Sequence, residues 1–167
     1  MDLPPFVILD RDSASRYLLS DEPDRGPSVQ SAISIGDPAE PMPEGLDRVP
    51  RRLRLEFHDV SVTEDVPWMG SMFVFPTLDH ARRIVRFADG IDGKTLVHCA
   101  MGISRSTAAA YISMCVLGGP GSEEQALRTV LELQPWAHPN RTLVEHADRL
   151  LRRGGAMIEL LDRGLDD

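Results

Sequence analysis

The chain has 167 residues, 42% of them hydrophobic, and carries a formal net charge of −8 at pH 7. This length suits one domain with a sizeable core, and the acidic balance argues against nucleic acid or an anionic membrane face as a partner. Only two cysteines are present, so no disulfide framework is implied and a reducing cytoplasm fits.

Export and membrane segments are not expected. The first five residues lack the basic start and the apolar run of a signal peptide. No apolar stretch approaches the roughly 20 residues that a membrane span needs. We therefore expect a cytoplasmic location.

The N-terminal segment carries little signal. Residues 6–9 form a short apolar run, typical of an edge strand, and Asp12 or Ser13 is the candidate cap of a short helix through Leu19. Beyond these two elements, we interpret residues 1–27 as an N-terminal extension.

The next part of the chain predicts two strands. Residues 28–35 alternate weakly and end in a Gly-Asp-Pro turn, which indicates a strand followed by a surface loop over residues 36–50, rich in Pro, Glu and Asp. Apolar and charged residues alternate in 53–57, as in a half-buried strand. Residues 60–75 show no clear period.

Helices dominate the second half. Apolar residues recur at helical spacing over 78–88, and residues 94–98 form an apolar strand that leads, through a loop, to a helix over 107–117. Ser122 and Gln125 have the spacing of a capping box for the next helix.

The last strong amphipathic pattern covers residues 143–151, and we interpret residues 152–167 as a C-terminal tail.

Strands that alternate with helices predict a single α/β domain over residues 1–167, with three α/β/α layers and a mostly parallel central sheet. Ligands in such sheets bind at the carboxyl ends of the strands.

The stretch that says most about chemistry is Leu-Val-His-Cys-Ala-Met-Gly-Ile-Ser-Arg-Ser, residues 96–106. A β-prone run leads into Cys99, and a loop with Gly102 leads to Arg105, where a helix begins. Such a strand–loop–helix directs backbone N–H groups and the positive end of a helix dipole at the loop, where a phosphate or another oxyanion would bind. The same field favours the thiolate form of a cysteine, and Arg105 adds a planar fork that suits two phosphate oxygens.

The pattern His98-Cys99-x-x-Gly102-x-x-Arg105-Ser106 resembles the signature of the cysteine-dependent protein tyrosine phosphatases, in particular the dual-specificity branch and its small bacterial relatives. Residues 55–59 resemble the strand end that carries the general acid of that family. Residues 134–140 resemble its Arg-Pro-x-x-x-Pro-Asn segment, with Asn140 as the loop-bracing asparagine and Gln134 in place of the usual arginine. The likeness covers roughly residues 28–151 and implies the three-layer fold of that family.

The resemblance implies a role for each residue of the motif. Cys99 is the predicted nucleophile and Arg105 the phosphate clamp, while the hydroxyl of Ser106 assists departure of the sulfur in the second step. The phosphate-binding backbone belongs to Ala100, Met101, Gly102, Ile103, Ser104 and Arg105. We expect the Ser104 side chain to stabilise the loop. His98 points away from the anion, and we expect it to hold the loop in place through hydrogen bonds.

Two aspartates compete for the role of general acid. Asp59 lies 40 residues before Cys99, at the end of the predicted strand 53–57, and is the preferred choice. Asp65 lies 34 residues before Cys99, a spacing nearer to that of the compact members of the family. Its environment beside Glu64 also suits a solvated surface acid.

These features predict hydrolysis of phosphate monoesters, with phosphotyrosine in proteins as the leading substrate, small aryl phosphates as alternatives, and no metal or other cofactor. Ala100 and Met101 stand where phosphoinositide-directed members carry lysines, which disfavours inositol lipids. Two other readings stay open. One is a binding module that holds phosphate without turnover. The other is a rhodanese-type sulfurtransferase, although five residues between Cys99 and Arg105 fit phosphate better than sulfane sulfur.

Overall fold

A parallel four-stranded sheet lies at the centre of the protein, in a computed structural model that describes residues 1–20, 28–61 and 72–165. The strand order is β1-β4-β2-β3, and each neighbouring pair is parallel. The strands are β1 (Phe6–Asp10), β2 (Ser31–Gly36), β3 (Arg51–Glu56) and β4 (Thr95–Cys99). Their carboxyl ends therefore meet at one edge of the sheet. The predicted α/β class with a parallel central sheet is confirmed.

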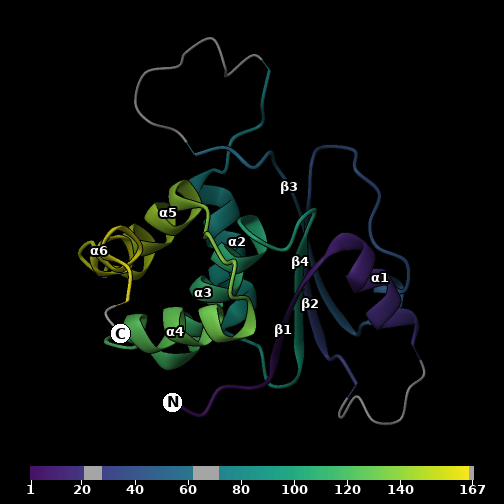
Figure 1. The fold of residues 1–167 in the computed structure, drawn as a ribbon, viewed down its shortest axis with the longest axis horizontal. Helices are drawn as coiled ribbons and strands as arrows, with labels where there is room; N and C mark the ends of the chain where they lie inside the picture. Colours follow the sequence, from purple (N-terminus) through teal and green to yellow (C-terminus); the bar gives the residue numbers. More distant parts are fainter. Residues whose placement is uncertain (21–27, 62–71, 166–167) are drawn as a thin grey trace.

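Helices cover both faces of the sheet, which gives three layers (Figure 1). One face carries α1 (Arg11–Leu19) and the short 3-10 helix η2 (Leu46–Arg48). The other face carries α2 (Leu78–Ala88), α3 (Arg105–Gly118), α4 (Glu123–Leu133), α5 (Arg141–Leu151) and α6 (Ala156–Arg163). Helix α3 packs on the sheet and is covered in turn by its neighbours, so that its residues 105–115 are all buried. A helix buried on all sides is mostly apolar all round, and the buried hydroxyls of Thr107 and Ser113 donate to the backbone oxygens of Ser104 and Ala109.

The two ends of the chain contribute more than the sequence predicted. Residues 6–10 pair with β4 as a full edge strand, and Phe6 and Ile8 belong to the main core. The predicted C-terminal tail contains α6, which buries Met157 and Leu160 against the same core. The described residues of the predicted extension, 1–20, and of the predicted tail, 152–165, therefore both contribute to the hydrophobic interior.

Two helix starts differ from the prediction, α1 in its cap residue and α4, whose N-cap is Ser122 as predicted, in the hydrogen bonds of that cap. Helix α1 is capped by the carboxylate of Asp10, which accepts a 2.8 Å hydrogen bond from the N–H of Ser13, and not by Asp12 or Ser13. The capping box of Ser122 and Gln125 is absent, because Ser122 has helical backbone angles and its hydroxyl donates to the carbonyl of Gly119 at 2.7 Å.

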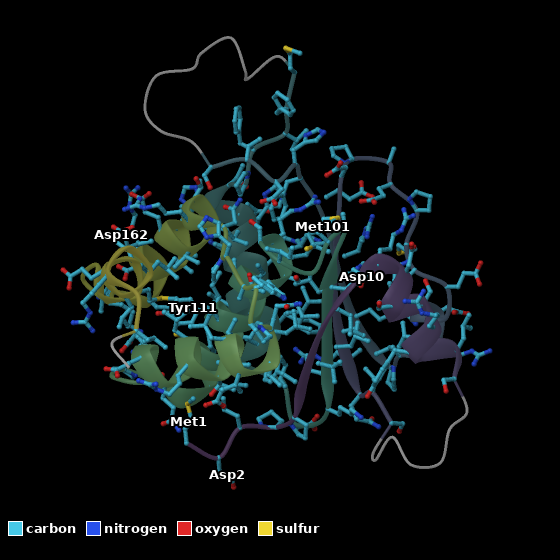
Figure 2. The ribbon with its side chains drawn as sticks, in the orientation of Figure 1. Met1, Asp2, Asp10, Met101, Tyr111 and Asp162 are labelled. Atoms are coloured by element: carbon cyan, nitrogen blue, oxygen red, sulfur yellow. The ribbon has the colours of Figure 1, made fainter. Side chains whose placement is uncertain are left out.

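None of the helices in the described part of the chain has the length and apolar character of a membrane span. Figure 2 shows that polar and charged side chains surround the layered ribbon on the visible side.

Candidate active site

The loop of residues 99–105, here called the Cys99 loop, connects β4 to α3 at the carboxyl edge of the sheet. Cys99 is the last residue of β4 and is buried. Its Sγ accepts a hydrogen bond from the backbone N–H of Gly102 at 3.2 Å and lies 3.2 Å from the hydroxyl oxygen of Ser106. Two hydrogen-bonding groups therefore surround the sulfur, both of the kind that stabilises negative charge on it.

The backbone carbonyl groups of the Cys99 loop hydrogen-bond to neighbouring segments and so hold the loop in place. Three of them accept hydrogen bonds from backbone N–H groups of surrounding segments. The pairs are Ala100 with Arg11 (3.3 Å), Ile103 with His138 (2.9 Å) and Ser104 with Asn140 (3.1 Å). In a trans peptide the C=O and the next N–H point in opposite directions. The N–H groups of Met101, Ser104 and Arg105 are therefore directed away from these donors, toward the interior of the loop.

Gly102 allows the loop to lie close to strand β1. Its φ is +71°, a conformation that side chains with a Cβ rarely adopt. A Cβ at this position would also lie 2.7 Å from the carbonyl carbon of Leu9 and from the backbone nitrogen of Asp10. The loop and the end of β1 thus fit together only because residue 102 is glycine.

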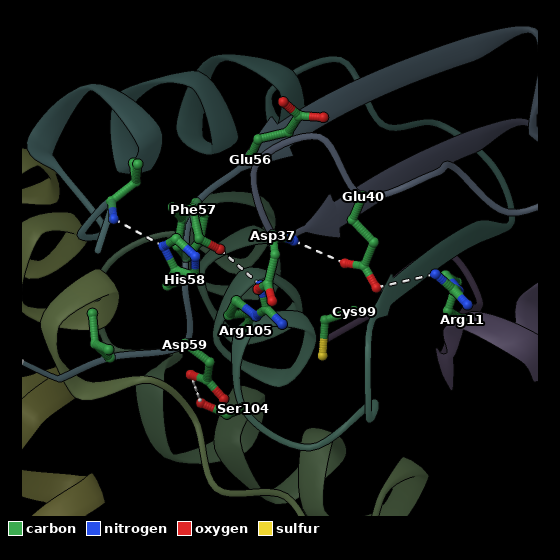
Figure 3. A network of polar contacts seen from close by, with 12 residues as sticks. Arg11, Asp37, Glu40, Glu56, Phe57, His58, Asp59, Cys99, Ser104 and Arg105 are labelled. Atoms are coloured by element: carbon green, nitrogen blue, oxygen red, sulfur yellow. Dashed lines mark hydrogen bonds and ion pairs between the residues drawn. The ribbon is translucent and has the colours of Figure 1, made fainter. Parts of the chain in front are cut away.

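Hydrogen bonds from one of its two terminal nitrogens hold the Arg105 side chain in place. Its side chain is 5% exposed, and Nη1 donates to Oδ1 of Asp37 and to the backbone oxygen of Phe57, both at 2.7 Å (Figure 3). The Nε atom is buried and has no hydrogen-bond partner among the described residues. Since both protons of Nη1 are engaged, the edge of the guanidinium formed by Nε and Nη2 is the part left for an anion.

Asp59 follows β3 and lies beside the Cys99 loop. Its Oδ1 accepts a 2.6 Å hydrogen bond from the hydroxyl of Ser104 and a 3.0 Å hydrogen bond from the side-chain amide of Asn140. Asn140 also caps α5, since its Oδ1 accepts from the N–H of Leu143 at 3.1 Å. Asp65, the alternative acid, lies outside the described residues.

His98 lies on the opposite side of β4 from the sulfur and is 1% exposed. Burial lowers its pKa to about 4, so the ring is neutral at physiological pH. One ring nitrogen, Nδ1, faces the carbonyl oxygen of Cys99 at 3.4 Å, and the other, Nε2, lies 2.6 Å from the hydroxyl of Ser34. A carbonyl can only accept, so the proton is assigned to Nδ1 and Ser34 donates to Nε2. Arg54 in turn donates to the Ser34 hydroxyl at 2.9 Å.

The structure brings the predicted residues Cys99, Arg105, Ser106 and Asp59 together with the Cys99 loop. Asp37 also contacts the site through Arg105, although the sequence predicted only a surface loop over this region. The feature that could have indicated Asp37 is its position directly after β2, because β2 lies next to β4 and ends at the same edge of the sheet.

The second cysteine, Cys115, takes no part in the site. It lies in the hydrophobic core on α3, and burial raises the pKa of its thiol to about 12.

Comparison with known proteins gives one curated relative and several solved structures. No family model matches the chain. Human "Protein phosphatase Slingshot homolog 3" is 36% identical over 87 residues, which are 52% of this chain and 12% of the human protein. The chain therefore spans only about an eighth of the length of that relative.

Solved structures match nearly the whole chain. DUSP15 has a TM-score of 0.58 and 22% identity, and the match covers 98% of this chain and 94% of DUSP15. Human DUSP28 has a TM-score of 0.55 and 22% identity, over 92% of this chain and 96% of that one. PTPMT1, solved in complex with PI(5)P, has a TM-score of 0.53 and 19% identity, over 90% of each chain. The resemblance drawn from the Cys99 motif is confirmed at the level of architecture, and the chain has the fold of the cysteine-dependent protein tyrosine phosphatase superfamily.

Proposed function

We propose that this chain hydrolyses phosphate monoesters through a phosphocysteine intermediate on Cys99, with phosphotyrosine in proteins as the leading substrate. The observation that carries the proposal is the arrangement of donors around the sulfur. The N–H of Gly102 bonds to the buried thiol, the N–H groups of Met101, Ser104 and Arg105 point into the loop, and the Nε of Arg105 is buried with no hydrogen-bond partner among the described residues. Such donors stabilise the charge that spreads over the equatorial phosphoryl oxygens in the transition state.

In the first step, the Cys99 thiolate attacks phosphorus and the bond from phosphorus to the leaving oxygen breaks. Asp59 gives its proton to that oxygen. Both hydrogen bonds to Asp59, from Ser104 and Asn140, end on Oδ1. The other oxygen, Oδ2, is therefore the one that carries the proton of the neutral acid.

In the second step, water attacks phosphorus and the P–S bond breaks. The carboxylate of Asp59 accepts the proton of the water, inorganic phosphate leaves, and the thiolate is regenerated. The Ser106 hydroxyl, 3.2 Å from Sγ, supports the sulfur as it regains its negative charge.

Two observations bear on the alternatives. A binding module without turnover would lack an acid near the sulfur, whereas Asp59 lies hydrogen-bonded to the same loop. The five residues between Cys99 and Arg105 fit phosphate better than the sulfane sulfur carried by a sulfurtransferase. Among phosphate esters, the lack of lysine at Ala100 and Met101 favours phosphoproteins over inositol lipids. The PTPMT1 complex with PI(5)P is nevertheless a reason to test lipids directly.

The test is a turnover assay on phosphotyrosyl, phosphoseryl and phosphothreonyl peptides, on phosphoinositides and on thiosulfate. We expect release of inorganic phosphate from the phosphotyrosyl peptide, and no turnover by Cys99→Ser. The same variant should still bind orthovanadate, because the loop amides and Arg105 are unchanged. Hydrolysis by Cys99→Ser would exclude the covalent mechanism, and turnover of thiosulfate alone would replace the proposed function by sulfur transfer.

A further inference from the structure

Asp37 contacts the candidate phosphate clamp directly. Its Oδ1 accepts a hydrogen bond from Nη1 of Arg105 at 2.7 Å. The arginine side chain is buried, while that of Asp37 is 50% exposed at the rim of the site (Figure 3). A charge-assisted bond of this length constrains the direction of the guanidinium plane more than a neutral one does.

We infer that Asp37 is a positioning residue, which turns the Nε–Nη2 edge of Arg105 toward the phosphoryl group; this inference rests on the proposed function. Nη1 is held at two points, by Asp37 and by the backbone oxygen of Phe57. Two acceptors on one nitrogen define the plane of the whole guanidinium, because the group is rigid and planar. With the Phe57 oxygen alone, the plane can rotate about that single bond.

Asp37 is itself held in place by a network around Glu40. The N–H of Asp37 donates to Oε2 of Glu40 at 2.8 Å, and Oε1 of Glu40 pairs with Arg11 at 3.2 Å. Arg54 donates to the backbone oxygen of Glu40 at 2.7 Å. A Cβ on Gly36 would lie 2.5 Å from Nη2 of Arg54 and 2.7 Å from Oε2 of Glu40. Glycine immediately before Asp37 leaves room for both of these side-chain ends, and the hydrogen bond from Asp37 N–H to Glu40 fixes the backbone from which the carboxylate projects.

The charge of Asp37 alone would weaken the site. A carboxylate beside Arg105 cancels part of the positive field that attracts a phosphate. A benefit from Asp37 must therefore come from orientation, and orientation requires an acceptor atom but not a negative charge. Asparagine keeps an acceptor oxygen at the same position, whereas alanine removes it. The two substitutions should consequently differ.

The experiment compares Asp37→Ala and Asp37→Asn with the wild-type protein on an aryl phosphate. We expect kcat/KM to fall about 10- to 100-fold in Asp37→Ala, the range that a small misplacement of a catalytic group produces. Asp37→Asn should keep most of the wild-type value. The exposed Asp47, in η2 of the same connection, provides the matched control, and Asp47→Asn should leave kcat/KM unchanged. Thermal unfolding shows which variants are folded, and Asp37→Ser replaces Asp37→Ala if the latter does not fold.

A double-variant measurement separates positioning from a general structural role. In an Arg105→Lys protein, which lacks the planar fork, Asp37→Ala should cause little further loss. Three outcomes would each overturn the inference. The first is a full additional loss of kcat/KM when Asp37→Ala is made in the Arg105→Lys protein. The others are an unchanged kcat/KM in Asp37→Ala alone, and a kcat/KM in Asp37→Asn as low as in Asp37→Ala. Direct calorimetry with inorganic phosphate adds a readout that needs no turnover, and Asp37→Ala should bind it more weakly. Absence of turnover in the wild-type protein would thus refute the proposed function, while the phosphate titration still tests the role of Asp37.

Discussion

Asn140 and Asp59 are separated by 81 positions in the chain, yet the Asn140 side-chain amide donates a 3.0 Å hydrogen bond to Oδ1 of Asp59. The same amide nitrogen donates to the backbone oxygen of Val60 at 3.1 Å, and the Asn140 oxygen caps α5. All the polar atoms of this side chain are therefore engaged, and the buried Asn140 at the start of α5 fixes the carboxylate beside the Cys99 loop.

Asp59→Asn should slow hydrolysis most strongly for substrates with a poor leaving group. Such leaving groups need a proton in the transition state, whereas an activated aryl oxide departs without one. The measurement is kcat across pH for an aryl phosphate and an alkyl phosphate, and the variant should lose the basic limb of the profile.

Asp65→Asn is the matched control for this experiment. It should keep both the leaving-group dependence and the basic limb of the wild-type profile. If the two variants exchange these behaviours, Asp65 is the general acid.

Ser106→Ala should slow the second step more than the first. The hydroxyl lies 3.2 Å from Sγ, and loss of one such hydrogen bond to the departing sulfur costs about 0.5–1.5 kcal/mol, or about 2- to 10-fold in rate. Rapid mixing with an aryl phosphate should then reveal a burst of the aryl alcohol followed by slow turnover.

Ser113→Ala provides a control in the same helix, because the Ser113 hydroxyl bonds only to the Ala109 carbonyl among the described residues. It should show no burst beyond that of the wild type. Equal slowing of both steps in Ser106→Ala would assign the serine to helix stability and not to the sulfur.

Gly102→Ala should destabilise the protein and abolish activity together. The positive φ alone costs a residue with a Cβ about 1–3 kcal/mol, and the new atom would collide with the backbone of Leu9 and Asp10. Gly154→Ala is the matched control, because Gly154 also has a positive φ, +65°, but has open space around it. Urea unfolding of both variants should show the larger loss for Gly102→Ala, and equal losses would mean that β1 does not confine the loop.

The stability of the protein should fall between pH 7.5 and pH 5, partly because of His98. Its pKa is about 4 in the folded protein, against the ordinary histidine value of 6.5 that applies to the unfolded chain. The unfolded chain therefore binds more protons between these values, so the stability provided by neutral His98 is present above pH 6.5 and is lost as the pH falls toward 4. From the two values, the loss at pH 5 is about 2 kcal/mol.

Chemical unfolding of the wild type and of His98→Asn at the two pH values isolates this contribution. Burial also lowers the pKa of His80 and His146, but both proteins share these residues. The variant should show the weaker pH dependence, and identical dependence in both would mean that His98 does not titrate as its burial implies.

The local parts of the site could be predicted from the sequence because their residues are neighbours in the chain. A β-prone run, a thiol, a glycine and an arginine within residues 96–106 specify a strand, an anion-binding loop and a helix start without reference to the rest of the fold. Asp59 could be placed near them because it follows a strand with clear alternation.

The parts that depend on strand order could not be predicted in this way. Asp37 reaches Arg105 because β2 lies beside β4, and Arg11 reaches the Ala100 carbonyl because β1 lies on the other side. No periodicity within residues 1–50 encodes these pairings. The capping box at Ser122 failed for a more local reason, since the backbone of Ser122 is helical and its hydroxyl is turned toward the carbonyl of Gly119.

Each strand of the sheet contributes a different part of the site at its carboxyl end. The end of β1 packs against Gly102, Asp37 follows β2, Asp59 follows β3, and Cys99 is the last residue of β4. These parts sit on separate connections, so an insertion in one connection leaves the anchor points of the other three in place. Such a layout lets a change in the length of one loop reshape the surface around the Cys99 loop while the other three parts of the site keep their positions.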